Sequence, residues 1–257
     1  IPDHVLVQVG DQTLYDVQYT TTQGQDCYDS NYLGEEVTVS GVVTAVQSWS
    51  TYPKFFIQSP VLQSWGGVYV YASEMEPLEI GDEVSFNAEV DEYYGVTELK
   101  NISNLEEISV NNNIEPISIS TGELSIDCNY DSEKYEGMLI EFNNIQVEFD
   151  DEFGSLYFND GTGIAKMDDY FYDLYDGQWP AGIGDVFESI TGVVHYAYGN
   201  YLIYPRSCND FIFEDGTSGC DNQVSIYDVQ FYSEDEVSCP PMITGCYESS
   251  LLGDAVN

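Results

Sequence analysis

Basic residues are scarce in this chain. The 257 residues include 5 Lys and Arg against 46 Asp and Glu, which gives a formal net charge of −41. Each contact with a nucleic-acid phosphate needs a cation, so five cations cannot track a phosphate backbone. The composition therefore excludes nucleic acid as a main partner.

The chain also has few histidines and no long apolar run. The two histidines are His4 and His195, and we interpret His195, inside a segment with strand character, as structural. A histidine metal site or a Ser-His-Asp arrangement would rest on one side chain. No P-loop lysine is present, and no apolar run approaches the roughly 20 residues of a membrane span. We therefore expect neither an enzyme nor a membrane-spanning chain.

The chain does contain enough apolar material for a packed core. Hydrophobic residues make up 43% and aromatic residues 14%, which argues against disorder. Residues 36–46 (EVTVSGVVTAV), 68–72 (VYVYA) and 83–90 (EVSFNAEV) combine alternation with β-branched and aromatic side chains. Turn pairs such as Tyr94-Gly95 and Asp160-Gly161 recur at short spacing. We predict an all-β fold.

The six cysteines favour an oxidising compartment. They fit a secreted product whose signal peptide was removed, as does the first residue, Ile1. Many pairings are possible, and buried free thiols are the alternative. Local pairs can form between Cys208 and Cys220 and between Cys239 and Cys246, which leaves Cys27 and Cys128 to pair with each other or across molecules.

An internal repeat is the most informative feature of the sequence. Residues 81–84 (GDEV) and 93–95 (YYG) recur as 184–187 (GDVF) and 196–199 (YAYG), and the offset from Gly81 to Gly184 is 103 residues. Two copies of roughly 100 residues, each with about five strands, have the size of a small Greek-key barrel.

A third copy begins and then stops. Residues 15–19 (YDVQY) reappear as 227–231 (YDVQF), and residues 27–30 (CYDS) reappear as 246–249 (CYES). Such a lead-in cannot bury its apolar residues alone, so we expect it to dock on its own chain or on the next molecule. The alternative is a stub left by proteolysis of a longer chain.

These segments resemble the tandem OB-fold-like modules of secreted bacterial proteins, which often sit beside extracellular nuclease, lamin-tail-like or surface-anchoring domains. The resemblance covers roughly residues 13 to 214, from LYDVQYTT through IGDEVSFNAEVDEYYG to GDVFESITGVVHYAYG. It implies two tandem OB-like barrels. A companion nuclease activity does not carry over, because only 44 residues follow Phe213. We divide the chain into an N-terminal strand (1–12), two OB-like repeats (13–112 and 113–216) and a truncated third-repeat lead-in (217–257).

Clustered acidic residues suggest calcium as a cofactor. Calcium takes six to eight oxygen ligands and tolerates irregular geometry. None of the clusters matches the spacing of an EF-hand loop, and a solvated acidic face is the alternative. The candidate ligands are Asp150, Asp151, Glu152, Asp160, Asp168, Asp169, Asp173 and Asp176.

Tyrosines offer a different kind of site. Small barrels bind ligands on one face, where aromatic rings stack on bases or sugars. The charge excludes polynucleotides but leaves a neutral polysaccharide possible. The alternative is that tyrosines fill the cores and the contacts between barrels. The candidate stacking residues are Tyr93, Tyr94, Tyr196, Tyr198 and Tyr201, with Tyr204, Trp49 and Trp65 as further candidates.

Two functions follow from these patterns. The first is a non-enzymatic, secreted structural protein whose barrels assemble head-to-tail with copies of itself into an extracellular filament or surface layer, with divalent cations at the acidic clusters. The second is a polysaccharide-binding accessory module of a secreted hydrolase or adhesin. Either function places the chain outside the cell or at its surface.

Overall fold

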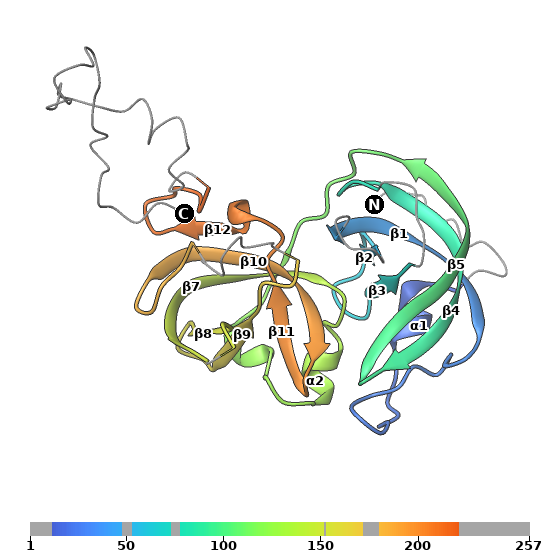
Figure 1. The fold of residues 1–257 in the computed structure, drawn as a ribbon, viewed down its shortest axis with the longest axis horizontal. Helices are drawn as coiled ribbons and strands as arrows, with labels where there is room; N and C mark the ends of the chain where they lie inside the picture. The colour runs from blue at the N-terminus through green and yellow to red at the C-terminus, as the bar shows by residue number, and fades with distance from the viewer. Residues whose placement is uncertain (1–11, 48–52, 73–77, 152, 172–179, 221–257) are drawn as a thin grey trace, which may run out of the picture.

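Two β-barrels lie side by side in the computed structural model, which describes residues 12–47, 53–72, 78–151, 153–171 and 180–220 (Figure 1). The predicted all-β fold is confirmed. The helical elements of the described residues are short: α1 (Leu14–Gln18), α2 (Tyr130–Glu133) and the 3-10 turns η1 (Thr121–Glu123) and η2 (Cys208–Asp210). No helix in these ranges is long and apolar enough to cross a membrane.

The first barrel is closed by five strands. They are β1 (Glu36–Gln47), β2 (Lys54–Gln58), β3 (Gly67–Tyr71), β4 (Glu83–Tyr93) and β5 (Val96–Ser109). The order around the barrel is β1-β2-β3-β5-β4, with β4 pairing back onto β1. The pairing between β3 and β5 is parallel and the others are antiparallel. This is the five-stranded Greek-key arrangement of an OB fold.

The second barrel repeats this strand order. Its members are β6 (Ile117–Ser118), β7 (Leu139–Asp150), β8 (Leu156–Asn159), β9 (Ile164–Met167), β10 (Val186–Ala197), β11 (Asn200–Tyr204) and β12 (Phe211–Phe213). Strands β7-β8-β9-β11-β10 follow the same circuit, and β10 pairs back onto β7. The short β6 and β12 flank the circuit. Strands β1 and β7 begin 103 residues apart, as do β4 and β10, which matches the sequence repeat.

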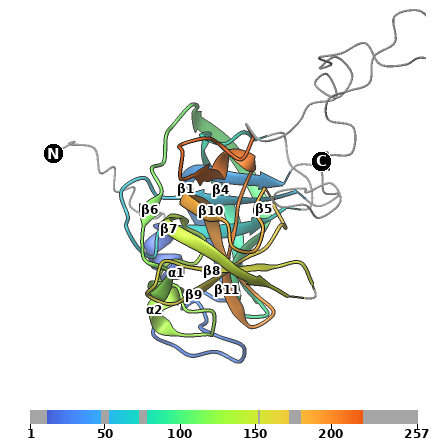
Figure 2. The ribbon, with the colours of Figure 1, turned by 90° about the vertical axis from the view of Figure 1, so that its left-hand side faces the viewer.

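The barrels share an apolar seam. On β2, the consecutive Phe55 and Phe56 are both fully buried. Phe55 packs in the core of the first barrel, whereas Phe56 joins the cluster that forms the core of the second. Successive side chains of a strand point to opposite faces, so β2 is covered by its own barrel on one side and by its neighbour on the other. Viewed from the side of the second barrel, the two lie one behind the other (Figure 2).

Backbone contacts fix the seam. A Cβ on Gly67 would lie 2.2 Å from the carbonyl carbon of Gly137, so only glycine allows this approach. Next to it, the side-chain oxygen of Gln58 accepts a hydrogen bond from the Leu139 amide at 2.7 Å. The Trp65 amide donates to the Lys134 carbonyl, also at 2.7 Å. These contacts set how the two barrels face each other.

Two disulfides are present among the described residues. Cys27–Cys128 joins the segments that lead into the two barrels, and Cys208–Cys220 closes a short loop around β12. Of the two possibilities for Cys27 and Cys128, the structure has the pair within one chain. These bonds suggest an oxidising environment.

The segments predicted to mediate assembly lie mostly outside the described residues. Gln12 is described from the predicted N-terminal strand, and its amide donates to the Thr38 carbonyl at 3.1 Å. Residues 217–220 are described from the predicted third lead-in, where Ser218 bridges to Ile212 beside β12. Cys239 and Cys246 fall outside the described ranges. Head-to-tail assembly therefore stays a prediction.

Candidate functional site

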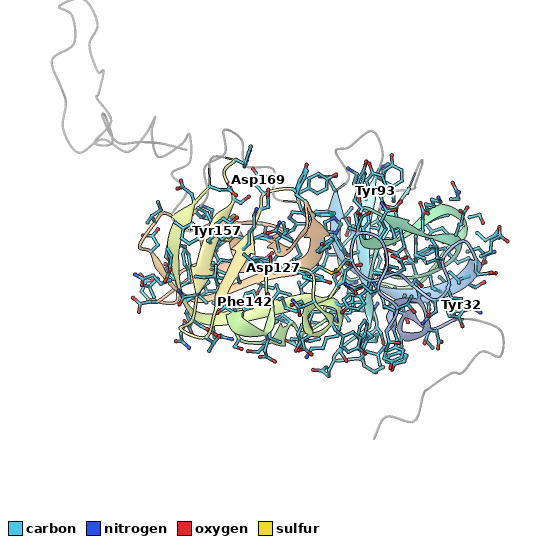
Figure 3. The ribbon with its side chains drawn as sticks, turned by 90° about the horizontal axis from the view of Figure 1, so that it is seen from below. Tyr32, Tyr93, Asp127, Phe142, Tyr157 and Asp169 are labelled. Carbon is cyan, nitrogen blue, oxygen red and sulfur yellow. A yellow bond between two sulfur atoms is a disulfide. The ribbon has the colours of Figure 1, made fainter. Side chains whose placement is uncertain are left out.

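A cleft of about 810 Å³ opens between the two barrels. Eight tyrosines line it, four from each barrel: Tyr69, Tyr71, Tyr93 and Tyr94 from the first, and Tyr170, Tyr196, Tyr198 and Tyr204 from the second. Tyr93 lies near the boundary between the barrels in Figure 3. A concave site walled by aromatic rings, with a few polar groups among them, is typical of a small-ligand site.

Two equivalent hairpin tips contribute to the cleft. Tyr94-Gly95 joins β4 to β5 with φ values of 51° and 86°, and Tyr198-Gly199 joins β10 to β11 with φ values of 53° and 82°. Two residues with positive φ make the type I′ turn that suits a tight hairpin, and Asn-Gly is its usual sequence. A tyrosine in the left-handed region is strained, yet Tyr94 is 70% and Tyr198 96% exposed. Neither ring is therefore held there by burial.

The inner wall is a cluster of tilted rings around His195. The His195 ring lies 5.0 Å from that of Tyr69 and 5.2 Å from that of Tyr204, centroid to centroid. Tyr170 continues the array, 5.3 Å from Tyr204. Burial is the main cause that raises the pKa of the Tyr69 and Tyr204 hydroxyls, so both keep their protons. These rings offer apolar area together with hydroxyl donors.

His195 supplies a polar group to the cleft. Its side chain is 9% exposed, and its Nδ1 has no hydrogen-bond partner. Burial, with a smaller contribution from Lys54, lowers the pKa of His195 from 6.5 to about 3. The imidazole is therefore neutral, and its Nδ1 is a buried nitrogen without a hydrogen-bond partner in the wall of the cleft.

The charged groups of the cleft are few. The Lys54 ammonium donates to the Tyr170 hydroxyl and lies 4.6 Å from the centre of the same ring. Burial, followed by repulsion from Asp91, raises the pKa of Glu98 from 4.5 to about 7, against the smaller opposing effects of two lysines. Asp26 lines the edge of the cleft. With Lys54 engaged and Glu98 partly protonated near pH 7, the interior favours an uncharged ligand.

Four of the five tyrosines proposed from the sequence meet in this cleft: Tyr93, Tyr94, Tyr196 and Tyr198. Tyr201 does not line it, because its ring is fully buried and its hydroxyl bonds to Glu133. Tyr201 and Tyr204 stand three positions apart on β11, so they face opposite sides of the sheet, and Tyr204 is the one that lines the cleft. Trp65 packs 5.5 Å from Tyr130 instead. Trp49 lies outside the described residues.

Several lining residues were not singled out from the sequence. Tyr69 and Tyr71 share one face of β3, and the alternation in VYVYA was a readable sign of that face. Lys54, Glu98 and Tyr170 reach the cleft only because the two barrels pack together. His195 lines the cleft in addition to filling the wall, whereas the sequence suggested only a structural role.

The acidic residues proposed for calcium are used within separate loops. Asp151 pairs with Lys166 at 3.4 Å, and Asp160 accepts a hydrogen bond from the Thr121 hydroxyl at 2.6 Å. Asp168 accepts from the Ser155 hydroxyl at 2.9 Å. Hydrogen bonds lower the pKa of Asp160 to about 2, although burial, the largest single effect, opposes them. These contacts give each of the three carboxylates a partner within the protein, so the loops do not need a cation to hold their conformation.

Two of the remaining candidates are described. Asp150 and Asp169 are exposed, whereas Glu152, Asp173 and Asp176 lie outside the described residues. Within the described ranges, no three acidic, histidine or cysteine side chains are arranged to hold a metal ion. Calcium binding stays a prediction.

Comparison with known proteins adds little. No protein-family model matches the chain, and no curated protein is similar to it. Among solved structures, it is similar to "OBody AM1L10 bound to hen egg-white lysozyme", with 19% identity, 31% of this chain and 83% of that chain covered, and a TM-score of 0.26. It is also similar to "OBody AM3L09 bound to hen egg-white lysozyme", with 14% identity, 40% of this chain and 98% of that chain covered, and a TM-score of 0.30. The fold assignment rests on the strand order of the two barrels.

Proposed function

We propose that this chain is a non-catalytic, secreted binding protein that holds a neutral polysaccharide in the tyrosine-lined cleft between its barrels. The observation that carries the proposal is the convergence of eight tyrosines, four from each barrel, on one cleft. Flat rings stack on the apolar faces of sugars, and their hydroxyls donate to sugar oxygens. The face of β3 and the β4–β5 turn, which supply Tyr69, Tyr71, Tyr93 and Tyr94, are surfaces on which OB folds take oligosaccharides.

Charge supports a neutral ligand over an ionic one. The net charge of −41 repels a polyanion at long range. A cationic ligand would have to stack where the Lys54 ammonium already lies over the Tyr170 ring. A sugar chain avoids both penalties and still finds polar partners in Glu98, Lys54 and the tyrosine hydroxyls that line the cleft.

Strain at the two hairpin tips supports binding over a purely structural role. Tyr94 and Tyr198 occupy left-handed positions that Asn would fill at lower cost, and their rings gain little from burial. Residues held in unfavourable backbone regions cluster at functional sites. A ligand that stacks on these two rings accounts for their presence.

Polysaccharide binding suits an accessory module of a secreted hydrolase or adhesin, as the resemblance to secreted tandem modules implies. Head-to-tail assembly into a filament remains a separate hypothesis, which depends on residues 1–12 and 217–257. The two functions are compatible, because the cleft lies between barrels of one chain.

Retardation in gels that contain a neutral polysaccharide tests the proposal. A β-glucan, a xylan, a mannan and a starch serve as probes, with a gel that lacks polysaccharide as reference. We expect at least one probe to retard the wild-type chain and not the double variant Tyr94→Ala/Tyr198→Ala. The matched control is Tyr15→Ala/Tyr130→Ala, since Tyr15 and Tyr130 are exposed tyrosines that do not line the cleft. Equal retardation of both double variants would refute the proposal.

A further inference from the structure

Two buried glutamates and one half-buried glutamate lie together in the seam, behind the cleft. Glu133 of α2 and Glu136, three residues later, are each 1% exposed. Glu136 accepts a hydrogen bond from the Thr97 amide at 2.9 Å, and Glu92 at the end of β4 accepts one from the Thr97 hydroxyl at 2.8 Å. Glu133 accepts one from the Tyr201 hydroxyl. We call Glu92, Glu133 and Glu136 the seam carboxyls.

Each seam carboxyl has one oxygen left over. Glu92 Oε2, Glu133 Oε1 and Glu136 Oε2 are buried without a hydrogen-bond partner. The described ion pairs engage Lys100, Lys166 and Arg206 with other acids. A buried carboxylate without a partner is very costly, so these groups need a cation or a proton. No three acids of the described ranges are arranged for a metal ion, which leaves protons.

We propose that the seam carboxyls are a proton-dependent latch that holds the two barrels together and thereby sets the shape of the tyrosine-lined cleft. When protonated, the groups carry no charge and do not repel one another across the seam. When ionised, the groups repel one another, and the seam loosens. Regulation of ligand binding rests on the proposed function; the opening of the seam does not.

Hydrogen bonds from Ser30, Thr97 and Tyr201 offset only part of the cost of ionising the seam carboxyls. Asp29 adds negative charge beside Glu92 and Glu133, and Asp91 adds more beside Glu92. The neutral groups that face the cluster include the hydroxyl of Tyr201, the amide of Gln18, and the Ser30 amide, which donates to Glu92 at 2.7 Å. Burial is the first cause that raises the pKa of all three seam carboxyls, and repulsion from neighbouring acids adds to it, whereas the hydrogen bonds that they accept oppose it.

The latch is connected to both walls of the cleft. Thr97, which bonds Glu92 and Glu136, stands on β5 between Val96 and Glu98, and both of these line the cleft. Tyr201, which bonds Glu133, packs its ring 4.9 Å from that of Tyr196 on the opposite wall. The sulfur of Cys27 lies 3.1 Å from the Tyr201 hydroxyl. Because Cys27–Cys128 ties the barrels, ionisation should open the seam without separating them.

Hydrogen–deuterium exchange on the oxidised full chain tests the latch without any sugar. After correction for intrinsic exchange, we expect protection of the seam amides of Thr97 and Leu139 to fall about tenfold or more between pH ~6 and pH ~9. Glu133→Gln/Glu136→Gln keeps the shape of both side chains and should remove this dependence. Glu123→Gln, at an exposed glutamate of η1, should retain it.

Two outcomes would overturn the latch. One is protection in the wild-type chain that does not change with pH. The other is protection restored at high pH by added calcium, which would identify a metal rather than protons. If the double variant fails to fold, carbon NMR of the glutamate carboxyls in the wild-type chain must show three groups that titrate well above the ordinary range. Failure of polysaccharide binding alone would leave the latch standing.

Discussion

Gly95 of the first barrel lies against the ring of Tyr196 of the second. A Cβ placed on Gly95 would be 2.7 Å from Cε1 of Tyr196 and 3.2 Å from Cβ of Cys27. The turn that presents Tyr94 is therefore fixed by the neighbouring barrel and by the disulfide beside it. The mouth of the cleft depends on this contact between the barrels.

Replacing Gly95 with alanine should lower the free energy of unfolding more than replacing Gly199, the equivalent glycine in the second barrel. Gly95 has a φ of 86° and a crowded Cβ position, whereas Gly199 has a φ of 82° and no atom within 4 Å of its Cβ position. We expect Gly199→Ala to lower the free energy of unfolding by about 1 kcal/mol through backbone strain, and Gly95→Ala by about 2–4 kcal/mol. Urea denaturation measures both. Equal losses in the free energy of unfolding would show that the Tyr196 ring can move to make room for the added methyl group.

Tyr198→Asn should make the chain more stable and a poorer binder. Asparagine tolerates the left-handed region better than tyrosine, and the Tyr198 ring is 96% exposed, so little packing is lost. The expected gain in the free energy of unfolding is about 0.5–1 kcal/mol, accompanied by weaker retardation by the polysaccharide probe. A gain in stability with unchanged retardation would mean that Tyr198 does not contact the ligand.

The two disulfides should contribute unequally to the free energy of unfolding. Cys27 and Cys128 are 101 residues apart, and Cys208 and Cys220 are 12 apart. Loop-closure entropy gives about 4–5 kcal/mol for the long loop and about 3 kcal/mol for the short one. Paired Cys→Ser variants, compared by chemical denaturation, measure the difference. A larger loss from the short loop would contradict the view that Cys27–Cys128 is the main covalent tie between the barrels.

His195 should weaken the fold in acid. Its pKa in the folded chain is lowered from 6.5 to about 3 by burial first and Lys54 second, so the unfolded chain binds a proton that the folded chain does not. The stability that neutral His195 contributes is present above pH 6.5 and is lost as the pH falls towards 3. His195→Phe should lose less stability than wild type between pH ~7 and pH ~4 by thermal melting. The same slope in both chains would show that His195 is protonated when folded.

Much of the fold could be predicted from local patterns. Alternation identified residues 36–46, 68–72 and 83–90, whose ends lie at most three residues from those of β1, β3 and β4. The internal repeat then predicted the same order of strands in the second barrel. Helix α1 was not predicted, although Thr13 and Asp16 form a capping box at its start and gave a local sign of it.

The candidate site could be predicted only in part. Tyr94 and Tyr198 were recognisable because a turn is encoded by two adjacent residues. Nothing in the sequence marks the seam carboxyls, since Glu133 and Glu136 of the second repeat resemble any surface acids until the first barrel packs against them. Lys54 and Tyr170 are far apart in the chain and meet across that seam. Contacts between the barrels carry no periodicity that a single sequence reveals.

The most direct test of the binding site is an NMR titration of the chain with ring-labelled tyrosine, using fragments of whichever polysaccharide retards it. The account predicts shifts at Tyr94 and Tyr198, assigned by single substitution, and unchanged signals from Tyr15 and Tyr130. Shifts confined to Tyr15 and Tyr130, or none at saturating ligand, would contradict a binding site between the barrels.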